Sequence, residues 1–124
     1  MPIRKPTDAE LAILRVLWSR GPSTVRQVAA AMDREGGYTT VLKLLQIMTE
    51  KRLVTRDESS RTHVYAAAYT EDQTQRQLVI DLVDRAFDGS AAKLVLQALA
   101  STKTTPEELD EIRRLVNKAR GGSR

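Results

Sequence analysis

Residues 38–51 read YTTVLKLLQIMTEK, and this stretch decides the fold. Its apolar residues recur three and four positions apart, which is the period of an amphipathic α-helix. The residues expected to face a core are Val41, Leu44, Leu45 and Met48. With about 100° of turn per residue, the opposite face collects short polar and basic side chains. That face comprises Thr39, Lys43, Gln46 and Glu50, with Thr40 and Ile47 on one flank and Leu42 on the other.

Two further helices are predicted before this one. Thr7 and Glu10 have the spacing of a capping box, so a first helix begins there and ends at Gly21-Pro22. Ser23-Thr24 can cap a second, short helix. Its apolar stripe is Val25, Val28, Ala29 and Met32. Residues 33–37 are polar and rich in glycine, which predicts a loop between the second and third helices.

After Leu53 the hydrophobic period changes from helical spacing to alternation. Residues 54–56 and 63–65 are predicted to be strands, with His63 in the second of them, joined by the loop 57–62. Three helices followed by a hairpin is the order of a winged helix-turn-helix domain. We therefore expect residues 1–70 to form a winged-helix domain.

In such a domain the third helix can enter the major groove of DNA, and the hairpin can reach the adjacent backbone. The outward residues able to pair with base edges or phosphates are Thr39, Thr40, Lys43 and Gln46. Which of these reads a base stays open. On the hairpin, Arg56 and Arg61 flank the tip and could touch phosphates, although Asp57 and Glu58 in the same loop oppose such a contact.

The charge distribution agrees with a polyanion-binding first half. The chain has 124 residues, and the first 70 carry 11 Lys and Arg against 7 Asp and Glu, while the remainder carries 9 of each. Excess positive charge supplies most of the non-specific affinity for nucleic acid, although a basic domain without that role is the alternative. The absence of cysteine and the single His63 exclude disulfide scaffolds and multi-histidine metal cages.

Residues 71–124 are predicted to form a helical dimerisation domain. Thr70 with Gln73, Ser90, and Thr105 with Glu108 can each cap a helix, and the tail from Lys118 is expected to be frayed. So few large apolar side chains give a thin core, which a two-fold dimer would complete. The apolar residues assigned to that dimer include Leu94, Leu99, Leu109, Ile112 and Leu115. The alternative is an intramolecular bundle against the first half.

Several short motifs together resemble the BlaI/MecI/CopY family of bacterial transcriptional repressors, which includes the penicillinase repressors. They are Pro6-Thr7-Asp8-Ala9-Glu10-Leu11 with Leu17-Trp18, Thr24-Val25-Arg26-Gln27-Val28, Tyr38-Thr39-Thr40-Val41 with Leu45, and Gly89-Ser90 with Leu94-Val95. The resemblance spans nearly the whole chain. It implies a winged-helix domain, a helical dimerisation domain, and repression by occupying a dyad operator.

The resemblance also implies how such repressors are released. In penicillinase repressors a membrane sensor-protease triggers cleavage at an Asn-Phe pair in the dimerisation domain, and the matching position here is Gln97-Ala98. This departure from the family pattern indicates either a different protease specificity or a different mode of release. Copper-responsive members carry a cysteine-rich C-terminus, which this chain lacks. Arg52 stands where similar proteins often have glycine after the third helix. It is expected to end that helix in left-handed geometry or to mark a reshaped connection, and it could add a phosphate contact.

The sequence thus predicts a mainly α protein with a small β-hairpin wing. Its expected partners are double-stranded DNA with a palindromic operator, a second copy of the chain, and a membrane sensor-protease. A winged-helix adaptor for proteins and a non-specific nucleic-acid binder are the alternatives. No catalytic grouping, metal cluster or cofactor motif is present in the sequence, so neither catalysis nor a cofactor is expected. With no signal peptide and no stretch of about 18 apolar residues, a cytoplasmic protein is expected.

Overall fold

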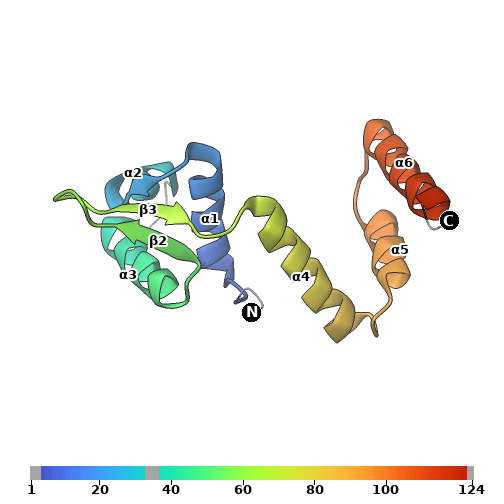
Figure 1. Cartoon of the computed structure of the whole chain (residues 1–124), viewed down its shortest axis with the longest axis horizontal. Coiled ribbons are helices and arrows are strands. Elements are labelled where there is room, and N and C mark those ends of the chain that lie inside the picture. Colours follow the sequence, from blue (N-terminus) through green and yellow to red (C-terminus); the bar gives the residue numbers. More distant parts are fainter. Residues whose placement is uncertain (1–3, 33–36, 123–124) are drawn as a thin grey trace. The chain divides into compact units, whose positions relative to one another are not determined.

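The computed structural model describes residues 4–32 and 37–122, and the chain divides into two compact units after Asp81. The first unit contains α1 (Asp8–Arg20), β1 (Ser23–Thr24), α2 (Val25–Met32), α3 (Gly37–Glu50), β2 (Val54–Asp57) and β3 (Val64–Ala67) (Figure 1). The chain continues through α4 (Glu71–Ala86), α5 (Ala91–Ser101) and α6 (Pro106–Gly122). This order confirms the predicted fold class. The loop predicted over residues 33–37 lies outside the described residues except for Gly37, which is the first residue of α3.

The boundaries of α1 follow from its end residues. At its start, the Glu10 N–H donates to Thr7 Oγ1 over 3.2 Å, and the Thr7 N–H donates to Glu10 Oε1 over 2.9 Å. This reciprocal pair is the predicted capping box. At its end, Gly21 has a φ of +91° and its N–H donates to the Leu17 carbonyl over 2.8 Å. A residue with a side chain rarely adopts such a φ, so glycine suits this position.

The wing is part of a three-stranded antiparallel sheet with the strand order β1-β3-β2. Strand β1 was not predicted, because two residues are too few to show an alternating pattern. Thr24 nevertheless also caps α2, since its Oγ1 accepts from the Gln27 N–H over 3.2 Å. The placement of His63 in a strand was wrong. The ladder between β2 and β3 ends at the pair Asp57 and Val64, so His63 belongs to the loop.

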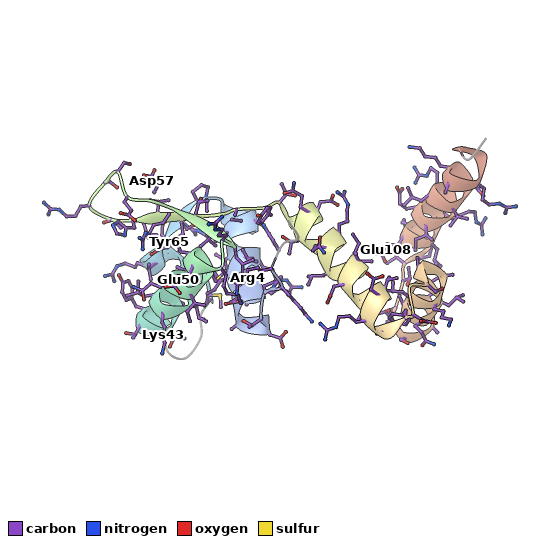
Figure 2. The ribbon with its side chains drawn as sticks, turned by 60° about the horizontal axis from the view of Figure 1, so that its bottom comes forward. Arg4, Lys43, Glu50, Asp57, Tyr65 and Glu108 are labelled. Atoms are coloured by element: carbon purple, nitrogen blue, oxygen red, sulfur yellow. The ribbon has the colours of Figure 1, made fainter. Side chains whose placement is uncertain are left out.

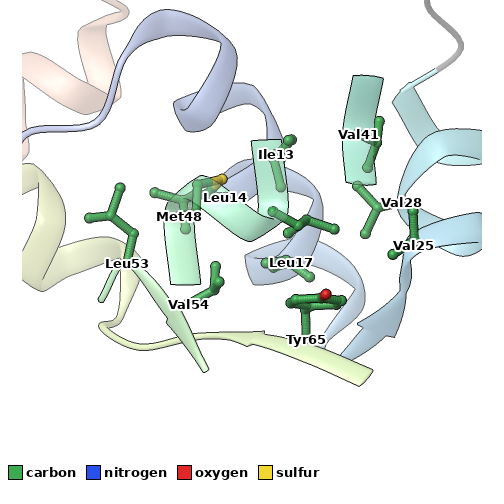
Figure 3. Close-up of a cluster of buried hydrophobic side chains, with 11 residues drawn as sticks. Ile13, Leu14, Leu17, Val25, Val28, Val41, Met48, Leu53, Val54 and Tyr65 are labelled. Atoms are coloured by element: carbon green, nitrogen blue, oxygen red, sulfur yellow. The ribbon is translucent and has the colours of Figure 1, made fainter. Parts of the chain in front are cut away.

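One apolar core lies between the three helices and the sheet of the first unit (Figure 3). Its buried members are Ile13, Leu14, Leu17, Val25, Val28, Val41, Leu45, Met48, Leu53, Val54 and Tyr65. Each helix contributes residues at helical spacing, as predicted. Leu44 and the α2 residues Ala29 and Met32 are only partly buried but pack against this core. One face of α3 is therefore packed into the core, and the opposite face is exposed to solvent.

The end of α3 has a backbone geometry that is unusual for its residue. Arg52 has a φ of +63°, which confirms the left-handed geometry expected there. The Leu53 N–H donates to the Met48 carbonyl over 2.9 Å, and the Arg52 N–H donates to the Thr49 carbonyl over 3.1 Å. These two bonds form a Schellman motif, whose left-handed position is usually glycine. The connection into β2 thus keeps its standard shape at the cost of strain in Arg52.

Replacing Arg52 with glycine is expected to stabilise the first unit by about 0.5–1 kcal/mol. Glycine removes the penalty of roughly 1–2 kcal/mol for a left-handed residue, and part of that gain is lost to the greater freedom of the unfolded chain. The urea midpoint of unfolding measures the change. Arg52→Lys, which keeps both the charge and the strain, is the matched control and should leave the midpoint unchanged. A glycine variant no more stable than the lysine variant would contradict the strain at this position.

The first unit extends into the first turns of α4. Thr74 is 3% exposed, and Trp18 Nε1 donates to the Tyr69 carbonyl over 3.0 Å just before the helix begins. Lys5 Nζ lies 4.0 Å from a carboxylate oxygen of Asp81. These contacts attach the beginning of α4 to the winged-helix core. The assignment of separate functions to residues 1–70 and 71–124 stays a prediction.

The helix starts predicted in the second half are confirmed. Thr70 and Gln73 form a reciprocal capping box, Ser90 Oγ accepts from the Lys93 N–H, and Thr105 and Glu108 form a further box. The prediction of a frayed tail from Lys118 was wrong, because α6 continues to Gly122. Lys, Ala and Arg favour helices, and positive charge is favourable near a helix C-terminus. Residues 123–124 lie outside the described part.

Candidate nucleic-acid interface

The outward face of α3 is the centre of the candidate interface. All four residues predicted to contact base edges or phosphates are exposed: Thr39, Thr40, Lys43 and Gln46. Val41, Leu45 and Met48 are buried on the opposite face. Figure 2 shows Lys43 and Glu50 on this helix, and Glu50 is the acidic residue at its end. The face therefore presents hydroxyl, amide and ammonium groups that can reach base edges or phosphates.

A buried ion pair fixes the C-terminal end of α3 against α1. Lys51 Nζ donates to Glu10 Oε1 over 2.6 Å, and the side chains are 18% and 3% exposed. Burial raises the pKa of the Glu10 carboxyl. The hydrogen bonds from Lys51 and from the Thr7 backbone together outweigh that effect and hold the pKa below its ordinary value. Glu10 is therefore charged at neutral pH, and it couples the start of α1 to the end of α3.

The wing presents two exposed arginines, one of which is paired with a carboxylate. Arg56 Nε donates to Glu58 Oε2 over 2.6 Å, and hydrogen bonding with Tyr65 and then with Glu58 raises the pKa of the Arg56 guanidinium. Backbone and side-chain hydrogen bonds of Ser59 lower the pKa of the Asp57 carboxyl in the same loop. Arg61 is exposed. A phosphate that contacts Arg56 would therefore have to compete with the Glu58 carboxylate. Arg61 lies in the loop between the two strands and is not paired with Glu58.

A polar groove between α2, the start of α3 and the wing was not predicted. It has a volume of about 310 Å³, and Arg26, Tyr38, Arg61 and His63 are among its lining residues. The Arg26 guanidinium carbon lies 5.5 Å from the centre of the Tyr38 ring. Hydrophobic periodicity placed Arg26 on the polar side of its helix but did not indicate that Tyr38 lies next to it. The contact between the two side chains depends on how α2 and α3 pack.

The residues predicted to form a dimer are exposed or partly exposed in the single chain. Leu99, Leu109 and Leu115 have exposed fractions of 39%, 45% and 57%, and Leu94 and Ile112 are partly exposed. None of the described residues 82–121 is buried. Helix α5 is apolar around most of its circumference, a composition that is typical of helices enclosed by other elements. Gln97 and Ala98, the position matched to the cleavage site, lie on this helix and are exposed.

Within 4–32 and 37–122, no three His, Cys, Asp or Glu side chains lie close enough together to hold a metal ion. No helix in the same ranges is both long and apolar enough to cross a bilayer.

The fold and this interface define a class of protein. Three helices, a wing on a three-stranded sheet, and a third helix held by one face make the first unit a winged helix-turn-helix domain. The model of the penicillinase repressor family matches residues 6–118. The chain belongs to this family, whose members are transcriptional regulators.

Individual relatives cover nearly all of the chain. Transcriptional regulator BlaI of Mycobacterium tuberculosis is 33% identical over 118 residues, which are 93% of this chain and 85% of that protein. Methicillin resistance regulatory protein MecI of Mammaliicoccus sciuri is 18% identical over 114 residues, covering 90% and 93%. The crystal structure of MepR, a transcription regulator of the Staphylococcus aureus multidrug efflux pump MepA, is 20% identical with a TM-score of 0.46. That alignment covers 95% of this chain and 80% of MepR.

Proposed function

We propose that this chain is a DNA-binding transcriptional repressor that occupies a dyad operator as a homodimer. The outward face of α3 carries the proposal, because it is exposed, polar or basic, and backed by the buried face of the same helix. Relatives that cover most of the chain are named as a penicillinase repressor and as transcriptional regulators. Binding of the dimer across a promoter would exclude the transcription machinery from the same DNA.

The outward residues would divide the work of recognition. Lys43 can donate to guanine O6 and N7, and Gln46 can pair with adenine through two hydrogen bonds. Thr39 and Thr40 can contact phosphates or thymine methyl groups. Arg56 and Arg61 would approach the DNA backbone from the wing. Arg56 would first have to break its ion pair with Glu58, whereas Arg61 has no such pair with Glu58. Two such domains in a two-fold dimer would face the two half-sites of a palindrome.

Replacing Lys43 with alanine is expected to reduce affinity for the specific site by about 1–3 kcal/mol, or roughly fivefold to hundredfold. A group that reads a base matters less on DNA without that base, so a scrambled duplex should lose much less affinity. Gel shifts on a duplex spanning the chain's own promoter, run across a salt series, measure both losses. Wild-type affinity should fall steeply with salt.

The control for this experiment is Arg15→Ala, which removes an exposed cation from α1. It should leave the ratio of specific to non-specific affinity unchanged. If the wild type forms no complex at low salt, DNA binding is contradicted, and a protein-binding adaptor becomes the better reading of the fold. If Lys43→Ala loses affinity equally on both duplexes, Lys43 contacts phosphate instead of a base.

The dimer and its release are the remaining parts of the proposal. The exposed apolar faces of α5 and α6 support a second copy as the partner, since each face lacks a cover within the described part of its own unit. We propose that proteolytic release occurs at the Gln97-Ala98 bond, which lies within α5. Both residues are inside this helix, which spans Ala91–Ser101. Cleavage of the bond between them by a sensor-protease would therefore require this part of the helix to open.

A further inference from the structure

The groove between α2, α3 and the wing has the chemistry of an anion site. Arg26 comes from α2, Tyr38 from the start of α3, and Arg61 and His63 from the wing loop. Side chains from three elements that are distant in the sequence thus line one volume of about 310 Å³. Two of these side chains are permanently cationic, and the histidine can donate a hydrogen bond. Among the described residues that line the groove, none carries a carboxylate.

Arg26 is held in place without losing its charge. Its guanidinium lies over the Tyr38 ring, with 5.5 Å between the guanidinium carbon and the ring centre. An aromatic face orients a guanidinium but does not neutralise it, whereas a carboxylate does both. Arg56 in the wing has the opposite arrangement, because Glu58 already pairs with it. Arg26 is therefore a better-prepared phosphate ligand than Arg56, which is one of the two hairpin arginines predicted to contact phosphates.

The position of the groove identifies the anion. Tyr38 directly precedes Thr39 and Thr40 on the face of α3 that would enter the major groove. The major groove is about 12 Å wide and is bordered by the two phosphate backbones, so a phosphate lies close beside any helix seated in it. A pocket at the start of that helix, lined on one side by the wing loop, would meet the backbone and not the base edges. A backbone phosphodiester fits this place and this chemistry.

We infer that this groove binds one backbone phosphate of each operator half-site, with Arg26 as the principal ligand and Tyr38 as its positioning residue. Arg61 and His63 supply further donors from the wing side. The inference rests on the proposed function, since it assigns a partner group to the same DNA-binding unit. It adds a role for α2 that the predicted contacts on α3 and the hairpin do not contain. Binding at this groove fixes the register of α3 without reading sequence.

Replacing Arg26 with glutamine is expected to weaken binding by roughly tenfold or more, because a charge-assisted hydrogen bond is lost. The loss should be equal on the promoter duplex and on a scrambled duplex, and the slope of log affinity against log salt should fall by about one. Arg15→Gln removes the same charge from α1, outside the groove, and should change affinity only slightly. Arg26 is exposed, so thermal unfolding should be unchanged.

A single neutral phosphate makes the test specific to the groove. Methylphosphonate placed in turn at each phosphate of the footprinted promoter site should weaken the wild type most at one position in each half-site. Neutralising that phosphate should not weaken the Arg26→Gln variant further, because the variant already lacks the arginine charge that would pair with the phosphate. Tyr38→Phe keeps the ring and should behave like the wild type on this scan. Tyr38→Leu should behave like Arg26→Gln.

Each contrary result has a distinct meaning. Wild-type affinity in Arg26→Gln would overturn the inference while leaving DNA binding through α3 intact. A loss confined to the promoter duplex would overturn it as well, because Arg26 would then read a base. A Tyr38→Leu variant with an unchanged phosphate scan would overturn the positioning role. Failure of the wild type to bind either duplex at low salt would remove the proposed function and this inference together.

Discussion

Replacing Lys51 with methionine is expected to destabilise the winged-helix unit by about 3 kcal/mol at neutral pH. Glu10 is only 2% exposed, and the substitution leaves its carboxylate without a cationic partner. Removing one member of a buried ion pair costs roughly 3–5 kcal/mol, and the lower figure applies because Lys51 retains some contact with solvent. Urea unfolding followed by circular dichroism measures the loss. The Thr7 capping box should survive, since it uses the Glu10 carboxylate and not Lys51.

The matched control is the double variant Glu10→Gln with Lys51→Met. Glutamine keeps the capping oxygen for the Thr7 N–H but removes the buried charge. We expect the double variant to recover most of the stability lost by Lys51→Met alone. A single variant as stable as the wild type would show that the pair contributes nothing. A double variant as unstable as the single one would assign the loss to packing of the lysine stem.

The pH dependence gives a second measurement of the same pair. In the wild type the pKa of Glu10 lies below its ordinary value, so its contribution to stability is present above pH 4–5, roughly, and is lost as the pH falls through the folded pKa. In Lys51→Met, burial is no longer opposed by the lysine, so the carboxyl is destabilising while it is charged. The difference between the two proteins should therefore be largest at neutral pH and shrink on acidification.

This ion pair also marks a limit of sequence-based prediction. Glu10 was recognised as the third residue of a capping box, because Thr7 lies three positions away and the pattern is local. Its pairing with Lys51 spans 41 positions and depends on how α1 and α3 pack. The N-terminal caps of α1, α2, α4, α5 and α6 were predictable for the same local reason. Contacts between elements were not predictable in this way. Periodicity shows which face of a helix is buried, but it does not show which residues of another element lie next to the edge of that face.

The candidate interface divides along the same line. The outward position of Thr39, Thr40, Lys43 and Gln46 follows from the 3.6-residue period and was predicted. The stacking of Arg26 on Tyr38 was not, because it arises where the ends of two helices meet. The pairing of Arg56 with Glu58 lies between these cases. The two residues were known to share the hairpin, but only the geometry of the loop brings the carboxylate onto the guanidinium.

The second unit shows what a correct pattern leaves undetermined. Its apolar stripes were predicted from periodicity, but the chain alone does not bury them, and Leu96 on α5 is 67% exposed. The amount of exposed apolar surface favours a partner, because contiguous apolar faces on an isolated chain are unfavourable in water. Sequence indicates that these faces must be covered. Which helix covers which face depends on the assembly.

Replacing Leu115 with glutamate is expected to convert the proposed dimer into a monomer. Leu115 is 57% exposed in the single chain, so a charge there costs the isolated unit little. In a dimer that covers this face the same carboxylate would be buried without a partner, which is strongly unfavourable. We expect the dissociation constant to rise by at least roughly a hundredfold, corresponding to about 2.7 kcal/mol. Sedimentation equilibrium across a concentration series measures it.

The control Asn117→Glu adds the same charge on the opposite side of α6 and should leave the dimer intact. Loss of the dimer should also reduce operator affinity by about 10²–10⁴, since the second domain no longer benefits from a high effective concentration at its half-site. Affinity for a single half-site should stay unchanged, because the winged-helix unit is untouched. If Leu115→Glu remains dimeric, this face of α6 is not the interface. If the wild type is itself monomeric at high concentration, recognition of a dyad by a preformed dimer is contradicted.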